Sequence, residues 1–95
     1  MIITDEITNY LDELGITAIE AEENTIVMTS FGFLGDFGVN VAHARAYIEK
    51  KTRTKGWIEG FGHGLVGPNH SGCVAIVTFE KPQRKRYPNF VLGDK

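Results

Sequence analysis

The stretch that decides the fold is residues 73–80, Cys-Val-Ala-Ile-Val-Thr-Phe-Glu, the most strand-like segment of the chain. It is rich in β-branched and aromatic residues, and at its start apolar side chains would occupy both faces. Such a strand is typical of the centre of a sheet. Pro82 follows almost at once and ends the strand, because proline cannot donate to a ladder. We therefore expect 73–80 to be a central strand.

The preceding segment, 57–66, alternates in a less usual way. One set of alternate positions carries large side chains and the other carries three glycines: Trp57, Glu59, Phe61, His63 and Leu65 against Ile58, Gly60, Gly62, Gly64 and Val66. Glycines weaken a strand but allow another element to approach closely. We expect a strand whose glycines receive the helix of residues 41–53; the alternative is a flexible glycine-rich loop. Residues 67–72, Gly-Pro-Asn-His-Ser-Gly, predict the turn into the central strand.

Further towards the N-terminus, the pattern predicts two helices and a hairpin. Apolar residues recur at helical spacing after Thr4 and after Asn40, two good N-cap residues. The two stripes are Ile7, Tyr10, Leu11 and Leu14, and Val41, Ala44, Tyr47 and Ile48. Gly15 and Gly56 would end these helices. Between the helices, 16–21 and 25–30 are rich in Ile, Val and Thr and flank an acidic turn, which predicts a β-hairpin.

The expected order is α-β-β-α-β-β within residues 1–80, followed by a basic, proline-containing tail over 81–95. Short connections favour antiparallel neighbours, so we expect a small α+β domain with a four-stranded, mostly antiparallel sheet and two helices on one face. A chain of 95 residues suits one domain. Neither a membrane-length apolar stretch nor a signal peptide is visible. The single cysteine favours a reducing setting, so we expect a cytoplasmic protein without a membrane partner.

The formal net charge of −2 hides a division along the chain. Residues 1–40 contain eight acids and no Lys or Arg, whereas residues 41–95 contain all ten basic residues and four acids. The halves therefore carry −8 and +6. Either the two halves lie together and neutralise each other, or one of them faces a charged partner.

Eight of the ten basic residues fall in two short clusters: Lys50, Lys51, Arg53 and Lys55, and Lys81, Arg84, Lys85 and Arg86. Trp57 and Tyr87 adjoin the clusters and could stack on bases, while the cations would neutralise phosphates. If the last strand ends near the second helix, the clusters merge into one patch. A sequence pI near 5.9 argues against a dedicated nucleic-acid binder. Nucleic-acid binding is therefore the alternative function rather than the expected one.

Residues 31–38, Phe-Gly-Phe-Leu-Gly-Asp-Phe-Gly, combine aromatic residues with glycine. Phe31, Phe33, Leu34 and Phe37 could bury in the core or anchor a protein partner, because interfaces concentrate their binding energy in buried aromatic anchors. The segment matches no phosphate-binding glycine motif. We interpret it as a candidate protein-binding loop.

Signals for chemistry are weak. His63, His70 and Cys73 lie close in sequence, but a structural zinc site would need a fourth ligand from His43 or Asp36. A Cys–His or Ser71–His70 nucleophilic pair can be imagined, yet no family signature surrounds these residues. We expect neither catalytic residues nor a metal or other cofactor.

The expected function is therefore that of a small non-catalytic binding protein, such as an inhibitor, adaptor or assembly factor of the kind that phages and mobile elements carry. It would act on a protein partner or on a second copy of itself. A homodimer would be the simplest form of self-association. A small enzyme using His63, His70 or Cys73 is the remaining alternative.

Overall fold

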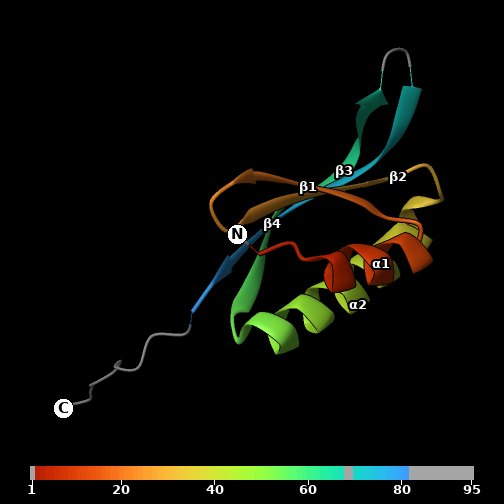
Figure 1. The fold of residues 1–95 in the computed structure, drawn as a ribbon. Helices are drawn as coiled ribbons and strands as arrows, with labels where there is room; N and C mark the ends of the chain where they lie inside the picture. Colours follow the sequence, from red (N-terminus) through yellow and green to blue (C-terminus); the bar gives the residue numbers. More distant parts are fainter. Residues whose placement is uncertain (1, 68–69, 82–95) are drawn as a thin grey trace.

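A computed structural model describes residues 2–67 and 70–81 and confirms the expected order of elements (Figure 1). The elements are α1 (Asp5–Glu13), β1 (Thr17–Glu22), β2 (Thr25–Ser30), α2 (Leu34–Thr52), β3 (Lys55–Gly67) and β4 (His70–Glu80). The strands form one antiparallel sheet in the order β1-β2-β4-β3. Both helices lie side by side on the same face of this sheet (Figure 1), so the fold class is confirmed.

The core lies between the helices and the sheet, and β4 supplies its centre. Cys73, Ala75, Val77 and Phe79 alternate along β4, and each is fully buried. β4 pairs with β2 on one side and β3 on the other, as a central strand must. The rest of the core comes from the N-terminal segment, the helices and β2: Ile2, Ile7, Leu11, Ile16, Ile26, Met28, Phe37, Val41, Ala44 and Ile48.

The second helix begins earlier than the sequence predicts. α2 starts at Leu34 rather than after Asn40, because Phe37 and Val41 continue its buried stripe by one further turn. Asn40 does not cap α2; its side-chain amide donates to the Leu14 carbonyl at the end of α1, at 3.2 Å. α2 ends at Thr52, where Arg53 takes the left-handed conformation (φ 58°) that was expected of Gly56.

The predicted strand over 57–66 is confirmed as part of β3, but its glycines do not receive the helix. A register shift between Ile58 and Gly60 bulges the strand at Glu59. Trp57 therefore pairs with Thr78 on the face away from the helices, whereas Phe61 pairs with Ala75 on the helix side. Gly60, Gly62 and Gly64 lie on the Trp57 side. Close approach to α2 occurs instead at Gly38, where a Cβ would stand 3.3 Å from the Phe61 ring, and at Gly56.

Candidate functional site

The phenylalanine segment divides between core and surface. Phe37 lies in α2 and is buried, and Leu34 packs against the core beside it. Phe31 and Phe33 precede the helix and are 72% and 82% exposed. The structure therefore places the four predicted partner-binding residues in two roles: Phe37 and Leu34 hold the segment to the domain, and Phe31 and Phe33 present aromatic rings at the surface.

Hydrogen bonds hold the backbone of the segment that carries the two exposed rings. The Cys73 thiol donates to the Gly32 carbonyl (3.2 Å), and the Gly32 N–H donates to the Ser30 hydroxyl (3.2 Å). The Phe37 N–H donates to the Phe33 carbonyl at 2.9 Å, which joins Phe33 to the first turn of α2. The segment is thus anchored at both ends to buried parts of the fold.

The β3–β4 hairpin adds apolar surface next to this segment. β3 and β4 continue past the end of β2 as a two-stranded arm (Figure 1), because the β2 ladder stops at the Ser30–Cys73 pair. On the helix-facing side of β3, Phe61 is 46% and Leu65 is 76% exposed. The Phe61 ring stacks on Phe37, with ring centroids 5.6 Å apart.

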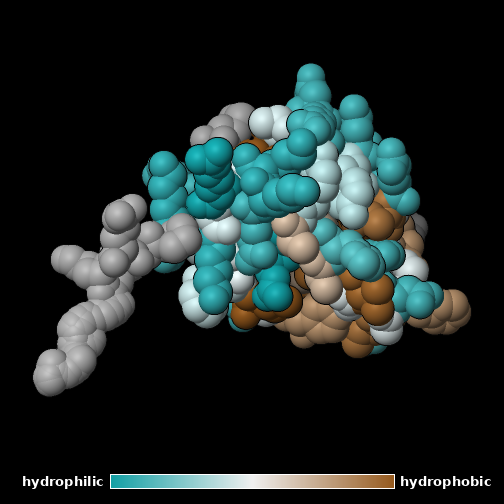
Figure 2. All heavy atoms as spheres, turned by 90° about the horizontal axis from the view of Figure 1, so that it is seen from below, coloured by the Kyte–Doolittle hydropathy of each residue, from teal (hydrophilic) through white to brown (hydrophobic). Residues whose placement is uncertain are grey.

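We name Phe31, Phe33, Phe61 and Leu65 the phenylalanine corner. Figure 2 views the molecule from the helix side and shows hydrophilic residues over much of the surface. Hydrophobic residues gather towards the end that carries the β2–α2 connection. The corner therefore combines large, exposed apolar side chains with anchored backbone.

The first basic cluster is described in full, and Lys81 is the one basic residue of the second cluster within the described residues. Lys50, Lys51, Arg53 and Lys55 surround the end of α2 and the start of β3, and all four are exposed. Lys55 is the register partner of Glu80, so Lys81 begins beside the first cluster. The remaining candidates of the second cluster lie outside the described residues: Arg84, Lys85, Arg86 and Tyr87.

Two of these lysines have partners within the chain. The Lys55 ammonium lies 5.0 Å from the centre of the Trp57 ring, which is 50% exposed. Lys51 forms an ion pair with Glu6 at 2.8 Å and lies over the Tyr47 ring. Lys51 therefore ties α2 to α1, and this role needs no ligand.

Glu6, Tyr47 and Lys51 form one electrostatic cluster between the helices. The Lys51 ammonium and then the Tyr47 hydroxyl, both hydrogen-bonded to its carboxylate, lower the pKa of Glu6. The bond to Glu6 raises the pKa of Lys51. Burial, followed by the same carboxylate, raises the pKa of Tyr47. Tyr10 completes the contact by stacking on Tyr47, with centroids 4.1 Å apart.

The acidic and basic halves of the chain meet at this cluster, but most of their charges are not paired with each other. Among residues 2–67 and 70–81, Lys51–Glu6 is the single ion pair within 4.0 Å. The exposed acids of α1 and of the β1–β2 turn otherwise face outward: Asp5, Asp12, Glu13, Glu22 and Glu23. The charge division seen in the sequence therefore persists on the surface.

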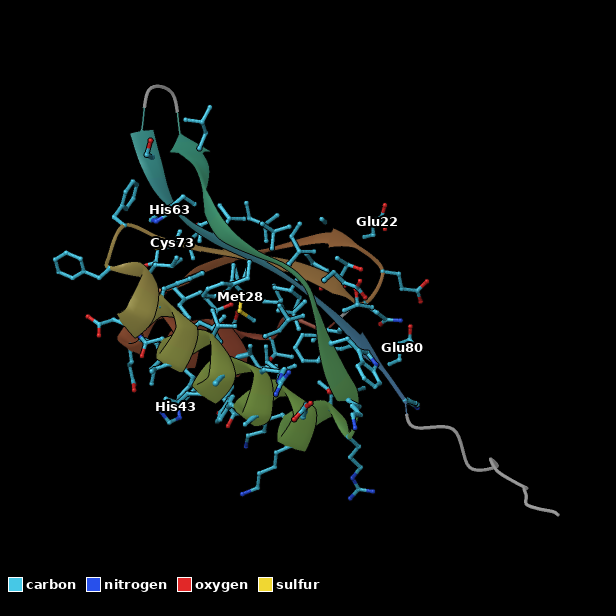
Figure 3. The ribbon with its side chains drawn as sticks, turned by 180° about the vertical axis from the view of Figure 1, so that it is seen from behind. Glu22, Met28, His43, His63, Cys73 and Glu80 are labelled. Atoms are coloured by element: carbon cyan, nitrogen blue, oxygen red, sulfur yellow. The ribbon has the colours of Figure 1, made fainter. Side chains whose placement is uncertain are left out.

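His63 and Cys73 are register partners on neighbouring strands and lie on the helix-facing side (Figure 3). Cys73 is fully buried, and its thiol donates to a backbone carbonyl rather than to the imidazole. Figure 3 shows His43 on α2, well away from this pair. Within the described part of the chain, no three metal-ligating side chains gather in one place. The side chain of His70 lies outside the description.

The sequence did not predict one exposed surface of the sheet. The sheet face away from the helices, which we name the open face, is not covered by any described element, and Ile76 at its centre is 37% exposed. At the start of 73–80, apolar residues occupy both sets of alternate positions, and the set that does not enter the core lies on the open face. The same pattern is typical of a strand buried on both sides. A sequence does not say how many layers cover a sheet.

Comparisons with known protein families, with curated proteins and with solved structures found no match to this chain. Neither of the helices in the described part of the chain has the length and apolar character needed to cross a membrane.

Proposed function

We propose that this protein is a non-catalytic binding module that docks a protein partner on the phenylalanine corner. The observation that carries the proposal is Phe33, a large aromatic side chain that is 82% exposed on backbone anchored to the core. Apolar side chains that gather on the surface of a soluble domain mark interaction sites more often than isolated ones do. An aromatic anchor on a fixed backbone also loses little conformational freedom on binding.

The corner is built from two segments that are far apart in the chain. Phe33 comes from the β2–α2 connection and Leu65 from the β3–β4 arm, and Phe61 joins them through its stacking on Phe37. A partner that inserts an apolar side chain between the arm and the start of α2 would touch both segments. The charged surfaces on either half of the chain would then steer the encounter rather than supply the binding energy.

The test is affinity capture from a lysate of the source organism with Phe33→Ser and Leu65→Ser. We expect both variants to lose a partner that the wild type retains, with affinity reduced at least about tenfold, because truncated anchors cost more than about 1 kcal/mol. Val39→Ser is the matched control, since Val39 is 57% exposed on α2 outside the corner. Capture should persist at high salt, because apolar contacts are not screened.

Nuclease treatment of the lysate distinguishes binding to a protein from the alternative function, binding to nucleic acid. Material that is retained only at low salt and disappears with nuclease would assign binding to nucleic acid at the basic residues near Lys55 and Lys81. That result, or equal capture by wild type and both corner variants, would overturn the proposal.

A further inference from the structure

The open face carries a band of apolar side chains that the helices leave uncovered. Ile19 on β1 is 61% exposed and Ile76 on β4 is 37% exposed. Val27 lies between them on β2, and Val74 is the next residue of β4 on this face after Ile76; both are half-buried. Trp57 on β3 is 50% exposed. An antiparallel sheet can leave one face to water, but the exposed apolar side chains gathered on this face suit burial under a second layer.

The strand register arranges this face in three cross-strand rows. The rows, read from β1 to β3, are Glu22, Thr25, Thr78 and Trp57; Ile19, Val27, Ile76 and Gly60; and Thr17, Thr29, Val74 and Gly62. The two edges of the face therefore differ. The β1 edge bears side chains in every row, whereas the β3 edge bears glycine in two rows and Trp57 in the third.

The two edges carry opposite charges at one pair of positions, Glu22 on β1 and Lys55 on β3. Glu22 is an exposed acid at the β1 end of the first row, and Figure 3 shows it on the side of the sheet away from the helices. Trp57 ends this row on β3. Lys55 lies two residues before Trp57, where it pairs with the exposed Glu80, and its ammonium lies 5.0 Å from the centre of the Trp57 ring. An acid at one edge and a cation near the same level of the opposite edge can face each other twice after a two-fold rotation.

We propose that the open face is the interface of a homodimer in which two sheets pack face to face. A two-fold axis parallel to the strands, between β2 and β4, brings β1 of each copy over β3 of the other. Glu22 then faces Lys55 and Trp57 of the second copy. Both contacts occur twice, which is the signature of a closed symmetric dimer. The strands of the two copies would cross at the shallow angle usual for aligned sheets.

The shapes of the two edges fit the same arrangement. Ile19 projects from the β1 edge and would lie over Gly60 of the second copy, where a trough is left by the absence of a side chain. A Cβ on Gly62 would meet nothing within 4 Å, and one on Gly60 would touch only Ile76. Val27 and Ile76 of the two copies would meet at the centre and exclude water from the interface.

Sedimentation equilibrium, which measures the mass of the particle in solution, tests this dimer in the wild type and in two charge-reversal variants. The wild type is expected to sediment at twice the 10.5 kDa of one chain. Glu22→Lys and Lys55→Glu alone should each weaken dimerisation about tenfold or more, because each places two like-charge contacts in the interface. An equimolar mixture of the two variants should recover the wild-type affinity, since both contacts of the mixed dimer again join opposite charges.

Controls separate the interface from general effects of charge. Glu13→Lys, an exposed acid reversed on α1, should dimerise like the wild type. Circular dichroism of each variant checks the fold. Since Glu80 is the register partner of Lys55, Lys55→Glu also places two acids side by side within one copy, and recovery in the mixture is the decisive readout.

Three results would overturn the proposal. The first is a wild type that stays monomeric at all concentrations, which would mean that the open face does not join two copies. The second is a dimer that neither reversal weakens. The third is a mixture that fails to recover.

Discussion

Gly56 lies at the start of β3 against a side chain of α2, and its lack of a side chain is required there. A Cβ at this position would stand 2.7 Å from Cγ of Arg45 and 2.8 Å from Cε2 of Phe79. The Phe79 ring is fully buried in the core. The Gly56 N–H also donates to the Glu49 carboxylate at 2.7 Å, which joins the start of β3 to α2.

We therefore expect Gly56→Ala to lower the free energy of unfolding by about 1–3 kcal/mol, the usual cost of overpacking a core. Urea denaturation measures the change. Gly35→Ala is the matched control, because a Cβ there meets nothing within 4 Å and alanine favours a helix. That variant should be as stable as the wild type or gain up to about 1 kcal/mol. Equal stability of Gly56→Ala and the wild type would contradict the close packing of α2 on the sheet.

At the scale of elements, α1 and α2 are joined by the cluster of Glu6, Tyr47 and Lys51, and its contribution to stability should depend on pH. The pKa of Glu6 is lowered in the folded state, so its contribution is present above the ordinary glutamate value of about 4.3 and is lost as the pH falls through the folded value. The pKa values of Tyr47 and Lys51 are raised, so their contributions are present below about 10 and are lost at higher pH.

Thermal unfolding of the wild type and of Glu6→Gln across pH 3–11 tests this link. We expect the wild type to have the higher Tm between about pH 5 and 10 and the difference to shrink on both sides of that range. The difference should also fall in high salt, because the pair is exposed to solvent. Glu13→Gln removes an acid of the same helix that has no ion pair among the described residues, and its Tm difference should stay small and flat. A Glu6→Gln difference that is equally flat would show that the cluster does not stabilise the helix pair.

Some elements could be predicted from sequence because their local residue pattern agrees with how they pack in the folded protein. In β4, the alternation of Cys73, Ala75, Val77 and Phe79 is both a strand pattern and the core. The start of α2 was missed because Gly35 and Gly38 are poor helix formers, and packing of the Phe37 ring overrides that preference. The bulge at Glu59 left no local signal, yet a shift of one residue moved Trp57 to the opposite face from Phe61.

The candidate site was predictable only in part, for a related reason. The sequence named Phe31 and Phe33 together with Leu34 and Phe37, but spacing alone cannot say which of four apolar residues the core will accept. Leu65 and Phe61 were absent from the expected surface because they join it through the arm, which depends on where the β2 ladder stops.

At the scale of the whole molecule, the division between acidic and basic halves gains a geometric meaning. The two halves meet side by side in one sheet, since β1 and β2 come from the acidic half and β3 and β4 from the basic half. Glu22 therefore lies at the edge formed by the acidic half, and Lys55, which pairs with Glu80, lies at the edge formed by the basic half. Internal neutralisation accounts for the Lys51–Glu6 pair. The edges of the open face remain available to a second copy.

A dimer built on the open face couples association to folding, so the stability of the whole molecule should depend on its concentration. Mass action favours the folded dimer as concentration rises, and a tenfold increase above the dissociation constant adds about 0.7 kcal/mol per chain, which corresponds to roughly 3–5 °C in Tm for a domain of this size. Ile76→Glu would place two charges at the centre of the interface and should remove this dependence while leaving the core side of β4 intact. Differential scanning calorimetry over a hundredfold range of concentration makes the measurement. A wild-type Tm that does not change over that range, or an Ile76→Glu Tm that still rises with concentration, would show that the open face does not join two copies.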